Sequence, residues 1–148
     1  ILKQESELLS RFISVLGDEQ ACLSNARADE LGDITHKKLQ LVEALNQIGI
    51  ERRALLPAHA GLNDAQAMAA WLAAHPQASD TVAAWHEIVQ LARQARQMHE
   101  LNGKLVSILL QKTNEALTIL TQNAPDQTLY GSDGQSAPTT GSRLVDSA

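Results

Sequence analysis

Five histidines are the side chains in this sequence best suited to metal or proton chemistry: His36, His59, His75, His86 and His99. No two of them are three or four residues apart, so no pair shares a helical face in adjacent turns. His86 and His99 are each followed by glutamate, as in a zinc-protease helix, but Gln90 and Gly103 occupy the position of the second ligand. We therefore expect all five on the surface or in helix packing.

The residues that other kinds of catalytic or binding site require are also missing from the sequence. No Glu-x-x-His pair of the kind that holds two irons in a helical bundle occurs, and there is no glycine-rich phosphate loop. Cys22 is the single cysteine, which excludes an internal disulfide, and a lone helical cysteine is most often simply buried. We expect no enzyme, no cofactor and no metal.

The composition favours helices and a non-catalytic class. Of 148 residues, 44% are hydrophobic, but only four are aromatic, and leucine and alanine dominate. The net charge of −5 argues against nucleic acid as a partner. The longest apolar run, residues 67–74, is too short to span a membrane. Residues 1–9 lack the features of a secretory signal, so we expect a cytoplasmic protein; since Ile1 is not an initiator methionine, we expect residues before it.

Hydrophobic periodicity predicts two helices in the first half. The first runs from about Ile1 to Ser24, with this stripe on one face: Leu9, Phe12, Ile13, Leu16, Gln20 and Leu23. A break or kink is expected over residues 25–32. The second helix runs from about Asp29 to Leu56 and ends at Pro57. Its heptad seam is Leu31, Ile34, Lys38, Leu41, Leu45, Ile48, Arg52 and Leu55. We expect Lys38 and Arg52 to extend along the edge of the packed face.

The second half predicts a short helix and a long one. Asn63 or Asp64 caps a short helix that closes at about His75. The long helix runs from Ser79 or Asp80 to about Gln122, with this predicted seam: Trp85, Ile88, Ala92, Ala95, His99, Asn102, Val106, Leu109, Thr113, Ala116 and Leu120. His99 and Asn102 in such positions set register more often than they carry chemistry.

These elements predict an all-α fold: an elongated antiparallel helical bundle, or coiled-coil-like hairpin of long helices, with one short connecting helix. We expect residues 1–122 to form the helical domain and residues 123–148, which are poor in large apolar side chains, to form a flexible C-terminal tail. The long helix measures roughly 65 Å and the second roughly 42 Å, so their pairing cannot cover the long helix fully. Either the first helix covers the remainder, or the distal part of the long helix is left for another partner.

The long helix also carries more large apolar residues than a two-stranded seam requires. They are Leu101, Leu105, Ile108, Leu109, Leu110, Leu117, Ile119 and Leu120. Two interpretations stay open. The residues pack against a further helix of the bundle, or they form an exposed face for a partner.

Three segments of this half resemble the FlgN family of flagellar export chaperones. They are Glu100-Leu101-Asn102-Gly103-Lys104-Leu105-Val106, then Asn114-Glu115-Ala116-Leu117-Thr118-Ile119-Leu120, and then Leu129-Tyr130-Gly131-Ser132-Asp133-Gly134-Gln135. Residues 50–56, which are rich in arginine and leucine, are also similar to the family. The resemblance covers the helical region and the start of the tail.

The resemblance implies a cytosolic chaperone that binds the hook-filament junction proteins FlgK and FlgL and escorts them to the flagellar export apparatus. It also implies partner binding through the C-terminal region. Carried over by position, the partner-binding residues are Leu101, Asn102, Leu105, Ile108, Leu109, Thr113, Leu117, Leu120 and Tyr130. The alternative is a coiled-coil dimerisation or adaptor module without a secreted client, in which a second copy of the chain covers the same residues as a homodimer.

Overall fold

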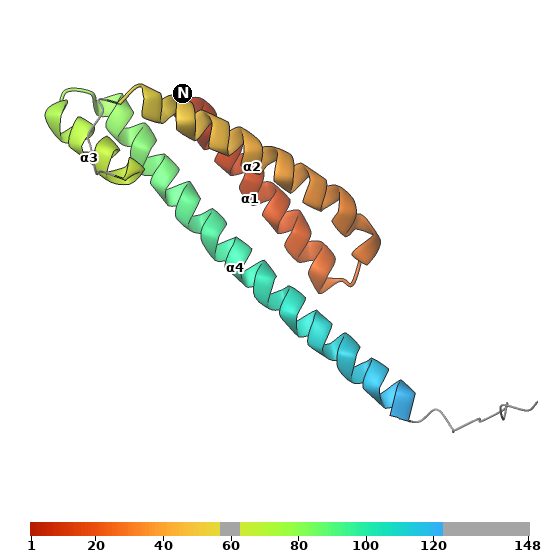
Figure 1. The fold of residues 1–148 in the computed structure, drawn as a ribbon. Helices are drawn as coiled ribbons and strands as arrows, with labels where there is room; N and C mark the ends of the chain where they lie inside the picture. The colour runs from red at the N-terminus through yellow and green to blue at the C-terminus, as the bar shows by residue number, and fades with distance from the viewer. Residues whose placement is uncertain (57–62, 123–148) are drawn as a thin grey trace, which may run out of the picture. The chain divides into compact units, whose positions relative to one another are not determined.

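The computed structural model describes residues 1–56 and 63–122, and every regular element in these ranges is helical (Figure 1). The elements are α1 (Leu2–Ser24), the 3₁₀ turn η1 (Ala28–Glu30), α2 (Leu31–Ala54), α3 (Asp64–Ala74) and α4 (Ser79–Gln122). The all-α prediction is confirmed, and the predicted helix ends agree to within two residues. Pro57 and the predicted tail lie outside the described residues. The chain divides into two compact units, residues 1–110 and 111–148, which we describe separately.

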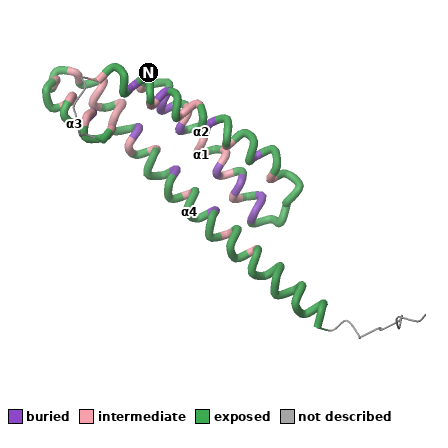
Figure 2. The backbone as a smooth tube through the Cα atoms, viewed as in Figure 1, coloured by how far each residue is buried: buried purple, intermediate pink, exposed green. Residues whose placement is uncertain are grey.

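In the first unit, α1 and α2 form an antiparallel hairpin along whose length the two helices lie side by side (Figure 1). Their facing stripes follow heptad spacing, so an apolar residue of each stripe is buried about every second turn of the helix. The buried apolar residues of the hairpin are Leu9, Leu16, Cys22, Leu23, Ile34, Leu41 and Ile48 (Figure 2). The predicted stripes are confirmed except at Leu55, which is exposed at the end of α2.

A turn over residues 25–30 connects the two helices, as the predicted break indicated. Ala26 has a φ of 54°, in the left-handed region. The Arg27 N–H donates to the Cys22 carbonyl and the Asn25 N–H to the Ala21 carbonyl, so these two carbonyls in the last turn of α1 have partners. This cap normally places glycine at the left-handed position.

Replacing Ala26 with glycine is therefore expected to raise the free energy of unfolding by about 0.5–1 kcal/mol, because glycine adopts positive φ without a Cβ clash. Urea unfolding followed by circular dichroism measures the change. The control is Ala28→Gly, two residues later in η1, where no positive φ is present and no stabilisation is expected. Equal effects at the two positions would contradict this account of the turn.

The short helix α3 begins as the sequence predicted. Asn63 is its N-cap and accepts a hydrogen bond from the Gln66 N–H, while the Gln66 side chain accepts one from the Asn63 N–H. This capping box satisfies two N–H groups at the start of the helix. At the other end, the His75 ring stacks on Trp71 with ring centroids 4.2 Å apart. His75 thus has a packing role.

Within the first unit, the seam of α4 follows a different heptad column from the predicted one. Ile88, Ala95 and Asn102 are buried as predicted. The predicted alternate positions Ala92, His99 and Val106 are exposed, and these neighbours are partly buried instead: Leu91, Met98 and Leu105. The physical reason is area: in each pair the residue one position earlier presents more apolar surface to bury than alanine, histidine or valine does.

Candidate partner-binding surface

Arg52 is the centre of a buried ionic cluster that joins α1, α2 and α3. Its guanidinium donates two hydrogen bonds to Glu5, at 2.8 and 3.1 Å, and two to Asp64, at 2.9 and 2.8 Å. Its Cζ also lies 4.9 Å from the ring centroid of Trp85 in α4. Four helices of the first unit therefore meet at one side chain, by two bidentate pairs and a cation–π contact.

This cluster corrects the prediction that Arg52 extends along the edge of the packed face, since the residue is only 7% exposed. Burial alone would lower the pKa of Arg52, but the hydrogen bonds that it donates to Glu5 and Asp64, together with their negative charges, raise it above its ordinary value. The guanidinium is thus held in its charged form. Its donors are turned to the two carboxylates, so it functions as a structural tie.

A second buried polar cluster joins α1, α2 and α4. Lys38 donates to one carboxylate oxygen of Glu19, and the Asn102 Nδ2 donates to the other at 2.9 Å. The same Nδ2 also donates to the Leu16 carbonyl at 2.9 Å. Lys38, predicted at the edge of the packed face, is partly buried and paired. Asn102 therefore binds α4 to α1.

The electrostatics of this second cluster favour the charged carboxylate. Burial raises the pKa of Glu19, but the hydrogen bonds from Lys38 and Asn102 together with the positive charge of Lys38 outweigh it, and the pKa lies below its ordinary value. One acceptor of this cluster is unsatisfied: the Asn102 Oδ1 is buried and accepts no hydrogen bond. A buried unpaired acceptor costs about 1–3 kcal/mol.

The sequence reasoning missed the acidic partners Glu5 and Glu19, although a signal for them exists. They are 14 residues apart in α1, and Lys38 and Arg52 are 14 residues apart in α2. Both separations are two heptads, so in an antiparallel hairpin one register brings both acids to both bases. Equal spacing of opposite charges along two apolar seams was the observation that could have predicted these pairs.

In the first unit, the predicted partner-binding residues divide into three classes. Leu101 and Ile108 are exposed, Ile108 by 49%, although both are large and apolar. Leu105 and Leu109 are partly buried. Asn102 is 2% exposed and contacts α1 as described above. Leu101 and Ile108 are seven residues apart, so they lie in one column of the helix and form an exposed apolar strip.

In the second unit, every described residue of α4, 111–122, is exposed (Figure 2). Among them are Thr113 and the large apolar residues Leu117, Ile119 and Leu120; Leu117 is 54% exposed. Leucine and isoleucine exposed together in one short helical stretch are characteristic of a surface that binds a partner. Tyr130, the remaining predicted residue, lies outside the described residues.

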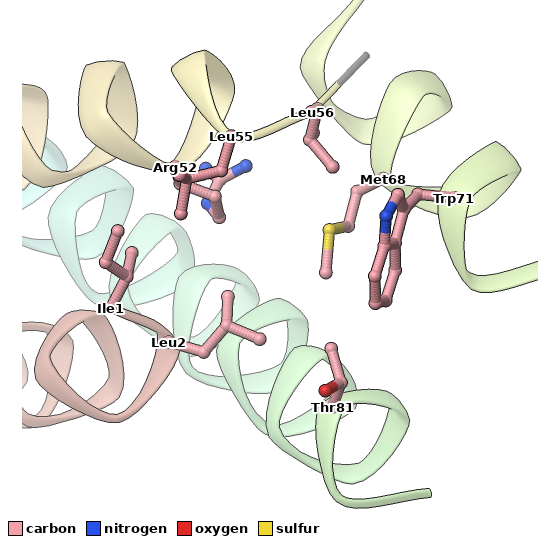
Figure 3. A pocket seen from close by; sticks show the side chains of 8 residues that line it. All are labelled: Ile1, Leu2, Arg52, Leu55, Leu56, Met68, Trp71 and Thr81. Carbon is pink, nitrogen blue, oxygen red and sulfur yellow. The ribbon is translucent and has the colours of Figure 1, made fainter. Parts of the chain in front are cut away.

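One apolar pocket of about 150 Å³ lies at the end of the first unit where α1 starts and α2 ends (Figure 3). Its apolar lining comprises Ile1, Leu2, Leu55, Leu56, Met68 and Trp71. The charged residue beside it is Arg52, whose donors are already used by Glu5 and Asp64. Thr81 adds one hydroxyl, so the described residues supply few polar groups to this pocket.

The single cysteine contributes to the packing of the first unit. Cys22 is buried, and its thiol donates to Glu30 at 3.5 Å. Burial raises the pKa of this thiol, and the hydrogen bond to Glu30 raises it further. Across residues 1–56 and 63–122, no three His, Cys, Asp or Glu side chains gather as metal ligands. Among the helices described, none is long and apolar enough to cross a bilayer.

The described part of the chain is thus an all-helical fold with an α1–α2 hairpin and a long helix that carries exposed large apolar residues. Residues 1–138 match the family described as FlgN protein, and the chain belongs to the FlgN family. It is 27% identical over 139 residues to the flagella synthesis protein FlgN of Salmonella typhimurium, covering 93% of this chain and 88% of the relative. It is 29% identical over 144 residues to the protein of the same name from Escherichia coli K12, covering 94% and 89%. No solved structure matches it.

Proposed function

We propose that this chain is a cytoplasmic export chaperone for flagellum assembly. It binds the hook-filament junction proteins FlgK and FlgL, prevents their premature association and escorts them to the export apparatus. Membership of the FlgN family and relatives named flagella synthesis proteins support the flagellar role. The observation that carries the chaperone role is the set of exposed large apolar residues in α4.

The client segment that suits this surface is an amphipathic helix. A helix with one apolar face binds an apolar helical partner through residues three, four and seven apart, as Leu101, Leu105 and Ile108 are. Covering the client's apolar face keeps client molecules from pairing with one another, which requires no bond to be broken. A segment that orders only on binding loses entropy, and this lowers the affinity and keeps the complex releasable.

We assign client contact to these residues of α4: Leu101, Leu105, Ile108 and Leu109 in the first unit and Thr113, Leu117 and Leu120 in the second. Tyr130 is the proposed contact from the following segment. Asn102 is assigned to the contact with α1, because its side chain is buried there.

The test is isothermal titration of FlgK and FlgL against single variants. Ile108→Asp and Leu117→Asp each place a charge where an apolar contact is proposed, and each is expected to weaken binding at least tenfold, which corresponds to about 1.4 kcal/mol. The matched control is Leu39→Asp on α2, an equally apolar residue that is 62% exposed and outside the proposed surface. If the α4 variants bind as tightly as the control, the assignment of the surface is wrong.

The same apolar residues would also suit a second copy of the chain, which is the dimerisation alternative. Sedimentation over a concentration series separates the two functions. A chaperone of this kind dissociates to a monomer on dilution and keeps its affinity for FlgK and FlgL. A dimer that persists on dilution and is disrupted by Ile108→Asp or Leu117→Asp, with no binding of either client, would establish the dimerisation module instead.

A further inference from the structure

The contact between α4 and the hairpin is weaker than the contact within the hairpin. The apolar residues that α1 and α2 bury number seven, whereas residues 79–110 of α4 bury Ile88 and Ala95. The backbones of α1 and α2 also approach closely over many turns, which those of α4 and the hairpin do not. Because apolar burial is the main favourable term in helix packing, α4 is the helix that separates at the lowest free energy.

The polar contact between α4 and α1 is incomplete as well. The Asn102 Nδ2 donates two hydrogen bonds to α1, one to the Leu16 carbonyl and one to Glu19. Its Oδ1 is buried and accepts no hydrogen bond. Exposure to water would supply that donor, so separation of the helices removes a cost that the closed state carries. Gly103 follows directly, has no side chain to pack and no neighbouring atom within 4 Å of its Cβ position.

The N-terminal end of α4, near Trp85, is held more firmly to the rest of the unit than the part near Asn102. Trp85 lies beneath the Arg52 guanidinium, which is itself fixed by Glu5 and Asp64. A cation–π contact to a desolvated arginine is stronger than one at the surface. Separation of α4 from α1 at Asn102, with the contact between Trp85 and Arg52 retained, is therefore the motion that breaks the fewest contacts.

We propose that α4 undocks from α1 at the Asn102 end while the hairpin stays folded, and that the undocked helix is the form that binds the client. The undocked form presents Ala95, Met98 and Leu105, which the docked form buries or partly buries, to an amphipathic client helix. The client step rests on the proposed function. The undocking step does not, because it follows from packing within the free protein.

Thiol labelling of the free, full-length protein tests the undocking step. Ala95→Cys in a Cys22→Ser background reports separation of α4, and Cys22 in the unaltered protein reports opening of the hairpin; both positions are nearly fully buried. The thiol at position 95 is expected to react at least tenfold faster. Adding Asn102→Leu, which removes both hydrogen bonds from Asn102 to α1, is expected to speed it about fivefold or more. Equal rates at the two thiols, unaffected by Asn102→Leu, would overturn undocking.

Cross-linking tests the client step. Gly17→Cys and Met98→Cys join α1 to α4 through a short bismaleimide, because the Met98 Cε lies 3.9 Å from the Gly17 Cβ position. The control joins α1 to α2 through Leu8→Cys and Ala44→Cys, which line one hollow between those helices. Both variants carry Cys22→Ser. Locking α4 is expected to weaken FlgK and FlgL binding at least tenfold, and the control cross-link to leave it unchanged.

The outcomes of this experiment are distinct. Full affinity in the α4-locked protein would overturn the client step and show that the docked surface binds. A Cys22→Ser protein that binds neither FlgK nor FlgL before cross-linking would overturn the proposed function and, with it, the client step. The labelling rates would still decide undocking.

Discussion

Replacing Arg52 with methionine is expected to lower the free energy of unfolding by about 3–5 kcal/mol, a large share of the stability of a small helical domain. The reason is that Glu5, buried in α1, loses its partner, and Asp64, at the start of α3, keeps only its longer contact to Arg53. Arg52→Lys is expected to recover only part of the loss, because an ammonium cannot form two bidentate pairs. Urea unfolding followed by far-UV circular dichroism measures both variants.

The adjacent residue provides the control. Arg53 also lies near Asp64, at 3.7 Å, but its side chain is 65% exposed. An exposed ion pair contributes about 0–1 kcal/mol, so Arg53→Met is expected to change stability by no more than that. Losses of similar size at Arg52 and Arg53 would show that the buried cluster is not what stabilises this end of the hairpin.

Reversing the charge of Glu19 is expected to have the second-largest effect. Glu19→Lys sets a second ammonium against Lys38 in the interior and removes the acceptor of Asn102, for a loss of about 3–5 kcal/mol. Adding Lys38→Glu restores an ion pair in the same register. The double variant is expected to be more stable than the single one, with a coupling free energy of about 1–3 kcal/mol.

The matched control for this reversal is Arg27→Glu at the exposed Arg27–Glu30 pair, where a change within about 1 kcal/mol is expected. A double variant no more stable than Glu19→Lys alone would mean that Lys38 does not act through Glu19.

Stability should also depend on pH through Glu19. Its folded pKa lies below the ordinary value of 4.5, so its contribution is complete above that pH and is lost as the pH falls through the lower folded pKa. Comparing wild type with Glu19→Gln across this acid range measures the contribution: the difference in unfolding free energy between the two proteins should shrink as the pH falls. A difference that stays constant with pH would contradict the role of the Glu19 charge.

The helices and their ends were predictable because the signals for them are local. Heptad spacing set the extent of α1, α2 and α4, and the Asn63–Gln66 capping box set the start of α3. The roles of Lys38 and Arg52 were not predictable in this way, since the residues that pair with them lie 19 and 47 positions away. A charged residue within an apolar seam indicates that an oppositely charged partner is needed. The sequence of its own helix does not identify that partner.

The surface of α4 was predictable only in part, for a related reason. The surplus of large apolar residues is visible in the sequence, but exposure at Ile108 and burial at Asn102 depend on which column of α4 meets α1. The choice between adjacent columns was decided by Leu91, Met98 and Leu105 together, against a predicted seam built on smaller or polar neighbours. Which column of α4 is buried therefore depends on both helices, α4 and α1.

The buried polar pairs also imply an order of folding. Lys38 meets Glu19 across 19 residues and Arg52 meets Glu5 across 47, whereas Asn102 meets Leu16 across 86. Shorter loops close at lower entropic cost, so the hairpin is expected to form first. On the ribosome, α1 and α2 are complete before α4 is synthesised. The helix that carries most of the exposed large apolar residues among those described therefore emerges beside a folded template, which shortens the time in which it could aggregate.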